Sequence, residues 1–134
     1  MGEVLVDSNV ILDIATEDPR WFDWSSTRLE EAAARHLLVI NPLIYAEVSI
    51  GYRRIEDLDA AVPPERFRRE TLPWEAAFLA GKAFLRYRRG GGRRRSPLAD
   101  FYVGAHAAVR GFILLTRDAR RYRTYFPTVT VVAP

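Results

Sequence analysis

Four carboxylates stand at positions where they could do chemistry: Asp7, Glu47, Asp100 and Asp118. Asp7 and Asp118 follow apolar runs that predict buried strands, although Asp is also a common cap for the helix that follows a strand. Glu47 and Asp100 lie in stretches that are apolar nearly all round, so partial burial is expected. A buried carboxylate tends to be neutral, to pair with a cation or to bind a metal. For Glu47 or Asp100 alone, a salt bridge to a distant arginine is an equal alternative.

Taken together, the four acids favour a metal site. Carboxylates that share one cleft repel one another unless a divalent cation lies among them. The chain has no cysteine and no evident histidine pair, so oxygen ligands indicate Mg²⁺ or Mn²⁺ rather than zinc. Such an ion suits phosphodiester hydrolysis, because it binds phosphate oxygens and activates water.

Two of these acids have similar local surroundings. Glu47 and Asp100 each fall in the first turn or two of a predicted helix. Each helix begins with a cap residue followed by proline, at 41–42 and 96–97. A glycine follows each acid four residues later, which leaves that face open for close packing. The shared pattern favours one site at which the two helices meet.

Apolar runs and helical spacing predict the elements that position these acids. Strands are expected at 3–6, 37–40, 112–116 and 128–132, with 66–72 extended. Helices are expected at 8–14, 21–36, 42–51, 55–62, 73–89 and 97–110, and after Asp118. The strands are continuous apolar runs that alternate with helices. The chain is therefore predicted to form one α/β domain over residues 1–134, a mainly parallel sheet of four to five strands with helices on both faces. Sites in such sheets form beyond the carboxyl ends of the strands.

The charge of the chain is divided unevenly. Residues 1–75 carry 8 arginines and 15 carboxylates, whereas residues 76–134 carry 11 arginines, one lysine and only two carboxylates, Asp100 and Asp118. Arginine offers a planar fork that suits phosphate, so the basic half favours an anionic partner. The acids of the first half, apart from Asp7 and Glu47, are expected to be mostly surface charge.

Composition excludes several other classes of protein. The absence of cysteine excludes a disulfide scaffold, a zinc–thiolate site and a thiol nucleophile, and it fits a reducing, cytoplasmic compartment. No apolar run reaches the roughly 20 residues that cross a bilayer, and no secretory signal is visible. No role in a membrane is expected.

Four segments carry a resemblance to a known family: VDSNVILD (6–13), the lone Glu in LIYAEVSIGY (43–52), PLADFYVGAHA (97–107) and LLTRDARRYRTYFPTVTVV (114–132). They are similar to the four acidic motifs of PIN-domain ribonucleases, and in particular to those of VapC toxins from type II toxin–antitoxin systems. The resemblance spans residues 4–132. It implies a PIN-like three-layer α/β/α sandwich.

The resemblance also implies a function and a site. It implies an Mg²⁺-dependent endoribonuclease that acts as a toxin, a VapB-like antitoxin as partner, and pairing as a homodimer. Asp7, Glu47, Asp100 and Asp118 would surround one or two Mg²⁺ or Mn²⁺ ions. Asn9 and Thr116 would help as polar neighbours. Some relatives carry a further acid shortly after the fourth aspartate, which this chain lacks.

Arginines near the acids are expected to contact RNA. The segment FLRYRRGGGRRRSP (84–97) leads directly into the helix that carries Asp100. Arginine and tyrosine together contact the backbone and stack on single-stranded bases. The candidate RNA-binding residues are Arg88, Arg89, Arg93, Arg94, Arg95, Arg117, Arg120 and Arg121.

Two other functions fit the same residues. The chain could be a PIN-fold nuclease of RNA processing, or a non-catalytic RNA-binding module in which the acids are structural. Steep salt dependence without a metal requirement would favour the second. His106, six residues after Asp100, falls on another helical face and is expected to be structural. The aromatic residues of the helices at 21–36 and 73–89 are expected in the core or in subunit contacts.

Overall fold

The computed structural model describes residues 2–91 and 98–134. Five parallel strands form one sheet in the order β3-β2-β1-β4-β5. The strands are β1 (Glu3–Val6), β2 (Leu37–Ile40), β3 (Phe67–Arg69), β4 (Ile113–Leu115) and β5 (Val131–Val132). The described residues also form seven helices: α1 (Ser8–Ala15), α2 (Phe22–Arg35), α3 (Pro42–Ser49), α4 (Ile55–Ala61), α5 (Trp74–Arg89), α6 (Leu98–Arg110) and α7 (Arg120–Tyr125).

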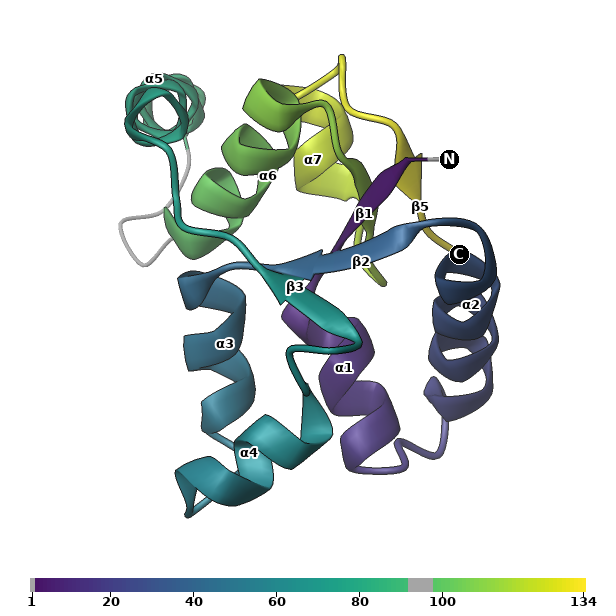
Figure 1. Ribbon diagram of the computed structural model, residues 1–134. Coiled ribbons are helices and arrows are strands. Elements are labelled where there is room, and N and C mark those ends of the chain that lie inside the picture. The colour runs from purple at the N-terminus through teal and green to yellow at the C-terminus, as the bar shows by residue number, and fades with distance from the viewer. Residues whose placement is uncertain (1, 92–97) are drawn as a thin grey trace.

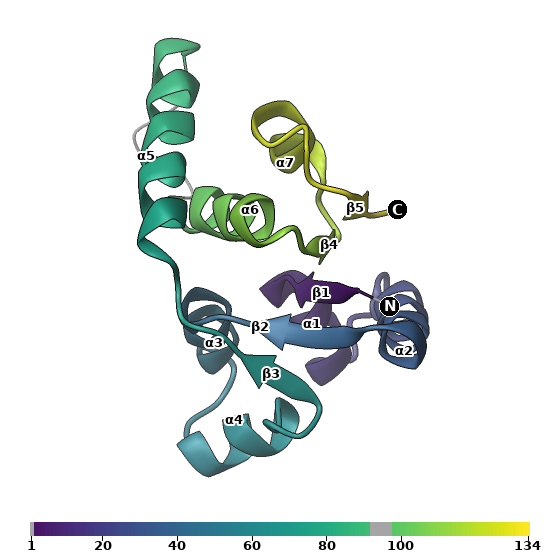
Figure 2. The same cartoon turned by 45° about the horizontal axis from the view of Figure 1, so that its top comes forward.

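The helices cover both faces of the sheet. The chain moves from β1 through β2 to β3 in one direction, and then crosses to β4 and β5 on the other side of β1. Right-handed crossovers therefore place α1–α4 on one face and α5–α7 on the opposite face, as Figures 1 and 2 show. The predicted three-layer α/β/α arrangement around a parallel sheet is confirmed.

The predicted elements differ from the observed ones mainly at the sheet edges. Residues 66–72 contain the edge strand β3, which is the fifth strand of the sheet. The predicted strand at 128–132 is reduced to Val131–Val132, because the Val129 N–H bonds to the Phe126 carbonyl in a turn and not to the sheet. The predicted Ser96-Pro97 helix start lies outside the described residues.

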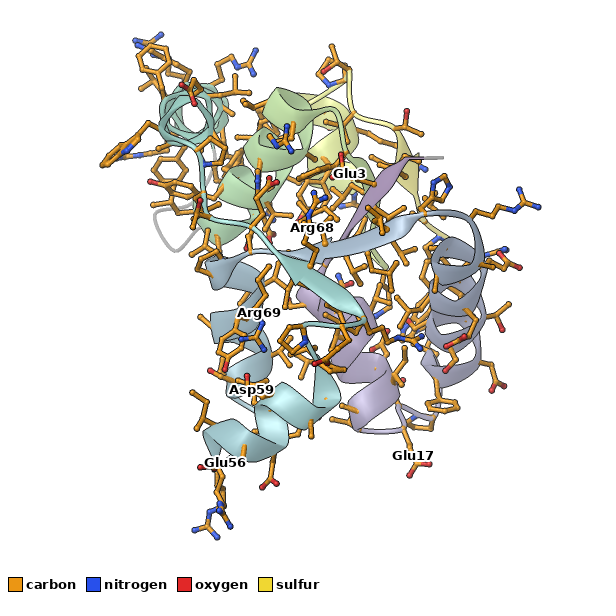
Figure 3. The ribbon with its side chains drawn as sticks, in the orientation of Figure 1. Glu3, Glu17, Glu56, Asp59, Arg68 and Arg69 are labelled. Atoms are coloured by element: carbon orange, nitrogen blue, oxygen red, sulfur yellow. The ribbon has the colours of Figure 1, made fainter. Side chains whose placement is uncertain are left out.

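Polar side chains of β3 tie the sheet edge to its neighbours. Arg68 pairs with Glu3 of β1, and Arg69 pairs with Asp59 of α4 at 2.8 Å (Figure 3). These ion pairs are partly exposed to solvent, which screens them, so they contribute little to stability. The packed strands matter more: Leu5, Val39 and Leu114 have no exposed surface.

Gly104 of α6 allows the close packing that was expected on the face of the helix that carries Asp100. A Cβ atom at Gly104 would collide with the ring of Phe126, which follows α7. At Gly51 an added Cβ would meet Leu12 at 3.6 Å, an ordinary contact. The close approach is therefore specific to α6, the helix that carries Asp100. None of the helices in the described residues is both long and apolar enough to cross a membrane.

Candidate active site

All four predicted acids line one cavity of about 220 Å³ at the carboxyl ends of β1 and β4. Its walls are formed by Asp7, Ser8, Asn9, Glu47, Asp100, Asp118, Arg121 and Tyr122. We call it the acid cavity. Asp7 comes from the end of β1, Glu47 from α3, Asp100 from α6 and Asp118 from the loop after β4.

The register of β1 against β4 places Asp7 beside Thr116. Val6 pairs with Leu115, so the residues that follow them lie next to each other where the two strands end. The Asp7 N–H donates to the Leu115 carbonyl at 2.9 Å, and the Thr116 hydroxyl donates to Asp7 Oδ2 at 2.9 Å. The Tyr122 hydroxyl donates to the same oxygen at 2.9 Å. Asp7 is thus fixed in a buried position, with 4% of its surface exposed.

Burial raises the pKa of Asp7 above its ordinary value. Hydrogen bonds from Thr116, Tyr122 and the Ser8 N–H oppose the rise, and the negative charge of Asp118 adds to it. Asp7 also caps α1 by accepting from the Ser8 N–H at 2.8 Å. The predicted alternatives of cap and site residue are therefore not exclusive, because one carboxylate can do both.

Glu47 and Asp100 face Asp7 from two different helices. The Ser8 hydroxyl donates to Glu47 Oε1 at 3.1 Å, and Arg121 donates to Asp100 Oδ2 at 2.8 Å. Burial raises the pKa of both acids, and Asp7 raises both further by repulsion. Asp100 also acts on Glu47, which shows that the acids share one electrostatic environment.

A small polar network joins Asp118 to the two predicted neighbours. Thr116 Oγ1 accepts from the Asn9 side-chain amide and from the Asp118 N–H, each at 3.2 Å. Asn9 Oδ1 in turn accepts from the Arg117 N–H at 3.1 Å. The structure therefore places Asn9 and Thr116 between Asp7 and the loop that carries Asp118.

The donor set fits a hard divalent cation. Four carboxylates and no sulfur or imidazole ligand line the acid cavity, and oxygen ligands suit Mg²⁺ or Mn²⁺. Within residues 2–91 and 98–134, no three acidic or histidine side chains are already arranged to hold an ion. Arg121 instead supplies the positive charge at Asp100. An ion would therefore require the acids to move closer together and Asp100 to share or release Arg121.

The predicted RNA-binding arginines divide into groups. Arg121 lines the acid cavity, whereas Arg120, Arg88 and Arg89 are exposed at the start of α7 and the end of α5. Arg93, Arg94 and Arg95 lie outside the described residues. Arg117 forms two hydrogen bonds with Asp13, at 2.9 and 3.0 Å. Its guanidinium therefore holds the loop after β4 against α1.

Three residues of this region are not predicted by the sequence pattern. It assigns no site role to Ser8 or to Tyr122, although Tyr122 follows Asp118 by one helical turn. Asp13 was grouped with surface acids, yet it is 2% exposed and also accepts from the Ser25 hydroxyl at 2.8 Å. The signal for Asp13 is its place on the apolar helix α1, the same criterion that singled out Glu47.

A second polar cluster lies at the carboxyl ends of β2 and β3. Its acid, Glu70, accepts from His106 Nε2 at 2.8 Å and from Arg110 Nε at 3.0 Å. The other ring nitrogen, His106 Nδ1, accepts from the Asn41 amide at 3.1 Å, and Asn41 Oδ1 caps α3. We call this group the Glu70 cluster. His106 is fully buried within it, in keeping with the structural role expected for it.

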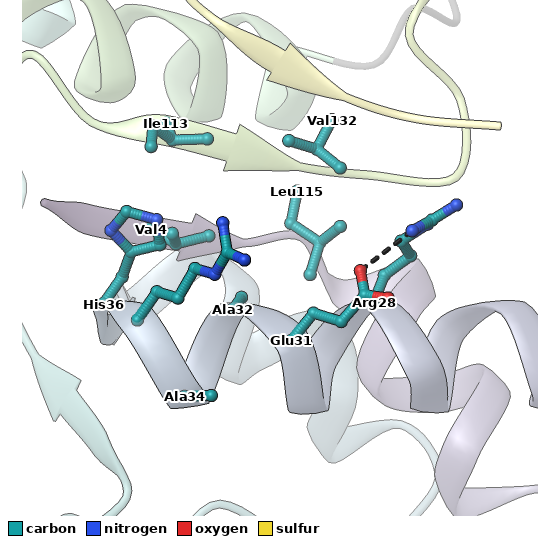
Figure 4. Close-up of a pocket in the computed structure, with 10 residues that line it drawn as sticks. Val4, Arg28, Glu31, Ala32, Ala34, His36, Ile113, Leu115 and Val132 are labelled. Carbon is teal, nitrogen blue, oxygen red and sulfur yellow. Dashed lines mark hydrogen bonds and ion pairs between the residues drawn. The ribbon is translucent and has the colours of Figure 1, made fainter. Parts of the chain in front are cut away.

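A larger cavity, of about 570 Å³, lies between α2 and the sheet (Figure 4). Val4, Ile113 and Leu115 form its apolar wall. Its charged residues include Arg28 and Glu31, which pair with each other at 2.8 Å. It lacks the group of mutually repelling acids, so size alone does not identify the chemical site.

Comparison with known proteins bears on the fold and the family. No curated protein matches the sequence. Among solved structures, VapBC2 from Rickettsia felis bound to a promoter DNA fragment matches with a TM-score of 0.75 and 15% identity over 98% of each chain. DNA-bound VapBC from Salmonella typhimurium matches at 0.71 and 20%, over 99% of this chain and 98% of that one. FitAcB from Neisseria gonorrhoeae matches at 0.67 and 17%, over 96% and 95%.

These likenesses show a shared fold. The family model of the PIN domain matches residues 4–127, which include all four acids of the cavity. The chain therefore belongs to the PIN domain family.

Proposed function

We propose that this chain is a metal-dependent endoribonuclease that acts as the toxin of a toxin–antitoxin pair. The observation that carries the proposal is the acid cavity, in which Asp7, Glu47 and Asp100 are partly or fully buried and Asp7 raises the pKa of the other two. PIN domains are generally nucleases that use divalent metals. The solved structures of similar fold named above are VapBC and FitAcB structures.

In the proposed site, Asp7, Glu47, Asp100 and Asp118 hold one or two Mg²⁺ or Mn²⁺ ions. A bound ion would neutralise the scissile phosphate and lower the pKa of a water that attacks it. Thr116 and Tyr122 keep Asp7 in place through Oδ2, and Ser8 orients Glu47 through Oε1. As the resemblance to PIN-domain ribonucleases implies, attack of water on phosphorus would break the P–O3′ bond, leave a 5′-phosphate and a 3′-hydroxyl, and not use the 2′-hydroxyl. Preference for RNA must therefore come from binding.

Binding is proposed to use the basic half of the chain. Arg88 and Arg89 lie in the last turn of α5, and Arg120 begins α7. All three are exposed and carry the charge that phosphate contacts require. Arg93, Arg94 and Arg95 belong to the same proposal on the strength of the sequence alone.

Two protein partners are proposed. One is a small VapB-like antitoxin that blocks the site in the cytoplasm. The other is a second copy of this chain. The aromatic residues of the helix at 21–36 are expected in the core or in subunit contacts, and Trp21, Phe22 and Trp24 are all half-buried in the structure. The exposed aromatic residues are Trp74 and Phe78 of α5, at 88% and 70% exposure. A homodimer would therefore be formed through α5.

The proposal is tested by comparing two Asp→Asn variants. Asp100→Asn removes a proposed ligand, whereas Asp23→Asn makes the same change at an exposed position of α2. With Mg²⁺ present, the wild type and Asp23→Asn should cut RNA and arrest growth, and Asp100→Asn should do neither. Sequencing of RNA 5′ ends after brief induction would identify the target.

Other outcomes would point elsewhere. RNA binding with steep salt dependence, but without cleavage or a metal effect, would favour the non-catalytic RNA-binding module. Cleavage without growth arrest, together with no antitoxin gene beside this one, would favour a PIN nuclease of RNA processing.

A further inference from the structure

We propose that a cavity beside the acid cavity is a subsite for one nucleobase of single-stranded RNA. The inference rests on the proposed function, because it assigns the base next to the phosphate that the acids would serve. The cavity measures about 410 Å³ and is lined by Tyr87, Asp118, Arg120, Arg121, Thr124 and Tyr125. We call it the tyrosine cavity. Its volume lies within the roughly 300–1,000 Å³ of small-molecule sites.

The position of the tyrosine cavity links it to the reaction. Asp118 and Arg121 line both this cavity and the acid cavity. One sugar separates a nucleobase from its phosphate. A chain whose phosphate lies at the acids would therefore bring a neighbouring base to the tyrosine cavity.

The lining matches the chemistry of a base. All six lining residues are aromatic, charged or hydroxylated. Single-stranded bases stack on tyrosine rings and on arginine guanidinium planes, and such stacking tolerates any sequence. Arg120 and Arg121 also offer donors to the flanking phosphates.

The two rings are held in place before any ligand arrives. Tyr125 packs against Phe101 with ring centroids 5.3 Å apart, and Tyr87 packs against the same ring at 5.4 Å. The two tyrosine rings meet edge to face at 6.0 Å, and Arg86 donates to the Tyr125 carbonyl at 3.3 Å. These contacts join α5, α6 and α7, which lie together on one side of the sheet (Figure 2). A fixed platform loses little conformational freedom on binding, which favours affinity.

The experiment separates base contacts from phosphate contacts. The probes are a short oligouridylate and an abasic oligomer of the same length, both labelled and measured by fluorescence anisotropy in EDTA, where no cleavage occurs. Wild type should bind oligouridylate about five- to 150-fold more tightly than the abasic oligomer, the range expected for stacking of one base. Tyr125→Leu should remove most of this preference and leave abasic binding unchanged. Tyr125→Phe, which keeps the ring, should preserve the preference.

Two further measurements make the result decisive. Arg89→Gln, at an exposed arginine that lines neither cavity, should weaken binding of both oligomers by the same factor, because phosphates are common to both. A 4-thiouridine probe should cross-link to Tyr125 or Tyr87, as read by mass spectrometry. Circular dichroism and thermal melting would verify that Tyr125→Leu is folded.

The subsite is wrong if wild type does not distinguish the two oligomers, or if folded Tyr125→Leu still does. It is also wrong if this variant loses only the binding of an antitoxin peptide, since the cavity would then receive a protein side chain. Failure of the proposed function looks different: base preference and cross-links would persist, but no RNA would be cut with Mg²⁺ or Mn²⁺.

Discussion

The acid cavity and the Glu70 cluster both hold carboxylates at the carboxyl edge of the same sheet, yet their electrostatics are opposite. In the Glu70 cluster one acid meets Arg110, His106 and Arg68. Burial acts to raise the pKa of Glu70, but the hydrogen bonds from Arg110 and His106 outweigh it and the pKa is lowered. In the acid cavity four carboxylates stand beside one lining arginine, Arg121, which pairs with Asp100, and the pKa values of Asp7, Glu47 and Asp100 are raised.

The difference separates a structural acid from a site that needs a cation. Glu70 already has its positive partners, so it links α6 to β3 and stabilises the fold. The acids of the cavity carry more negative charge than their surroundings balance, and this excess is what a divalent ion would neutralise. Groups with perturbed pKa values tend to gather at functional sites.

The largest expected effect is the loss of cleavage in Asp7→Asn. We expect activity with Mg²⁺ to fall by at least about 100-fold, because changing even a residue that only orients metal ligands typically costs about 10–100-fold. The ion-free protein should keep or gain stability, since the change removes a buried charge. Initial rates of RNA cleavage with Mg²⁺ measure the activity, and urea unfolding in EDTA measures the stability of the ion-free protein. If the variant loses stability together with activity, Asp7 has a structural role.

Glu70→Gln should have the opposite effect, lowering the stability of the fold rather than the activity. Removing the carboxylate leaves His106 and Arg110 without their charged acceptor, which should lower the free energy of unfolding by about 1–3 kcal/mol. Glu31→Gln is the control, because the exposed Arg28–Glu31 pair is worth only about 0–1 kcal/mol. Urea unfolding of both variants provides the comparison. A Glu70→Gln loss no greater than that of Glu31→Gln would place Glu70 among ordinary surface ion pairs.

The acid cavity and the Glu70 cluster differ in how well the sequence predicts them. The apolar runs fix the parallel sheet, and the strand ends then bring Asp7 and Asp118 together, so the acid cavity was predictable. The ion-pair partners of the arginines were not predictable. Arg117 and Arg121 look equivalent in sequence, but one pairs with Asp13 and the other with Asp100. Which arginine meets which acid depends on the paths of the side chains between helices, and local spacing does not encode them. The Glu70 cluster depends on three segments far apart in the chain.

Arg121→Gln should sharpen the comparison by removing the cation that the acid cavity has. Without Arg121, Asp100 is left among other carboxylates, so Mn²⁺ should bind more tightly, by up to about fivefold for a partly exposed ion pair. Arg120→Gln makes the same change of charge at the preceding residue, which is exposed, and should alter the Mn²⁺ affinity less. Isothermal titration with Mn²⁺ measures both. Weaker Mn²⁺ binding in Arg121→Gln would show that Arg121 supports the metal site and does not compete with the metal for Asp100.

The pH dependence of stability should differ in sign between the two regions. The folded pKa of Asp7 lies above its ordinary 3.8, so its charge destabilises the ion-free protein progressively as pH rises from that value through the folded pKa. The folded pKa of Glu70 lies below its ordinary 4.5, so its contribution is full above that value and is lost as pH falls through the folded pKa. In EDTA, the gain of Asp7→Asn over wild type should therefore grow with rising pH. The loss of stability in Glu70→Gln relative to wild type should also grow with rising pH. Urea midpoints measured from pH 3 upward test both trends, and parallel curves for the two variants would show that the clusters do not differ electrostatically.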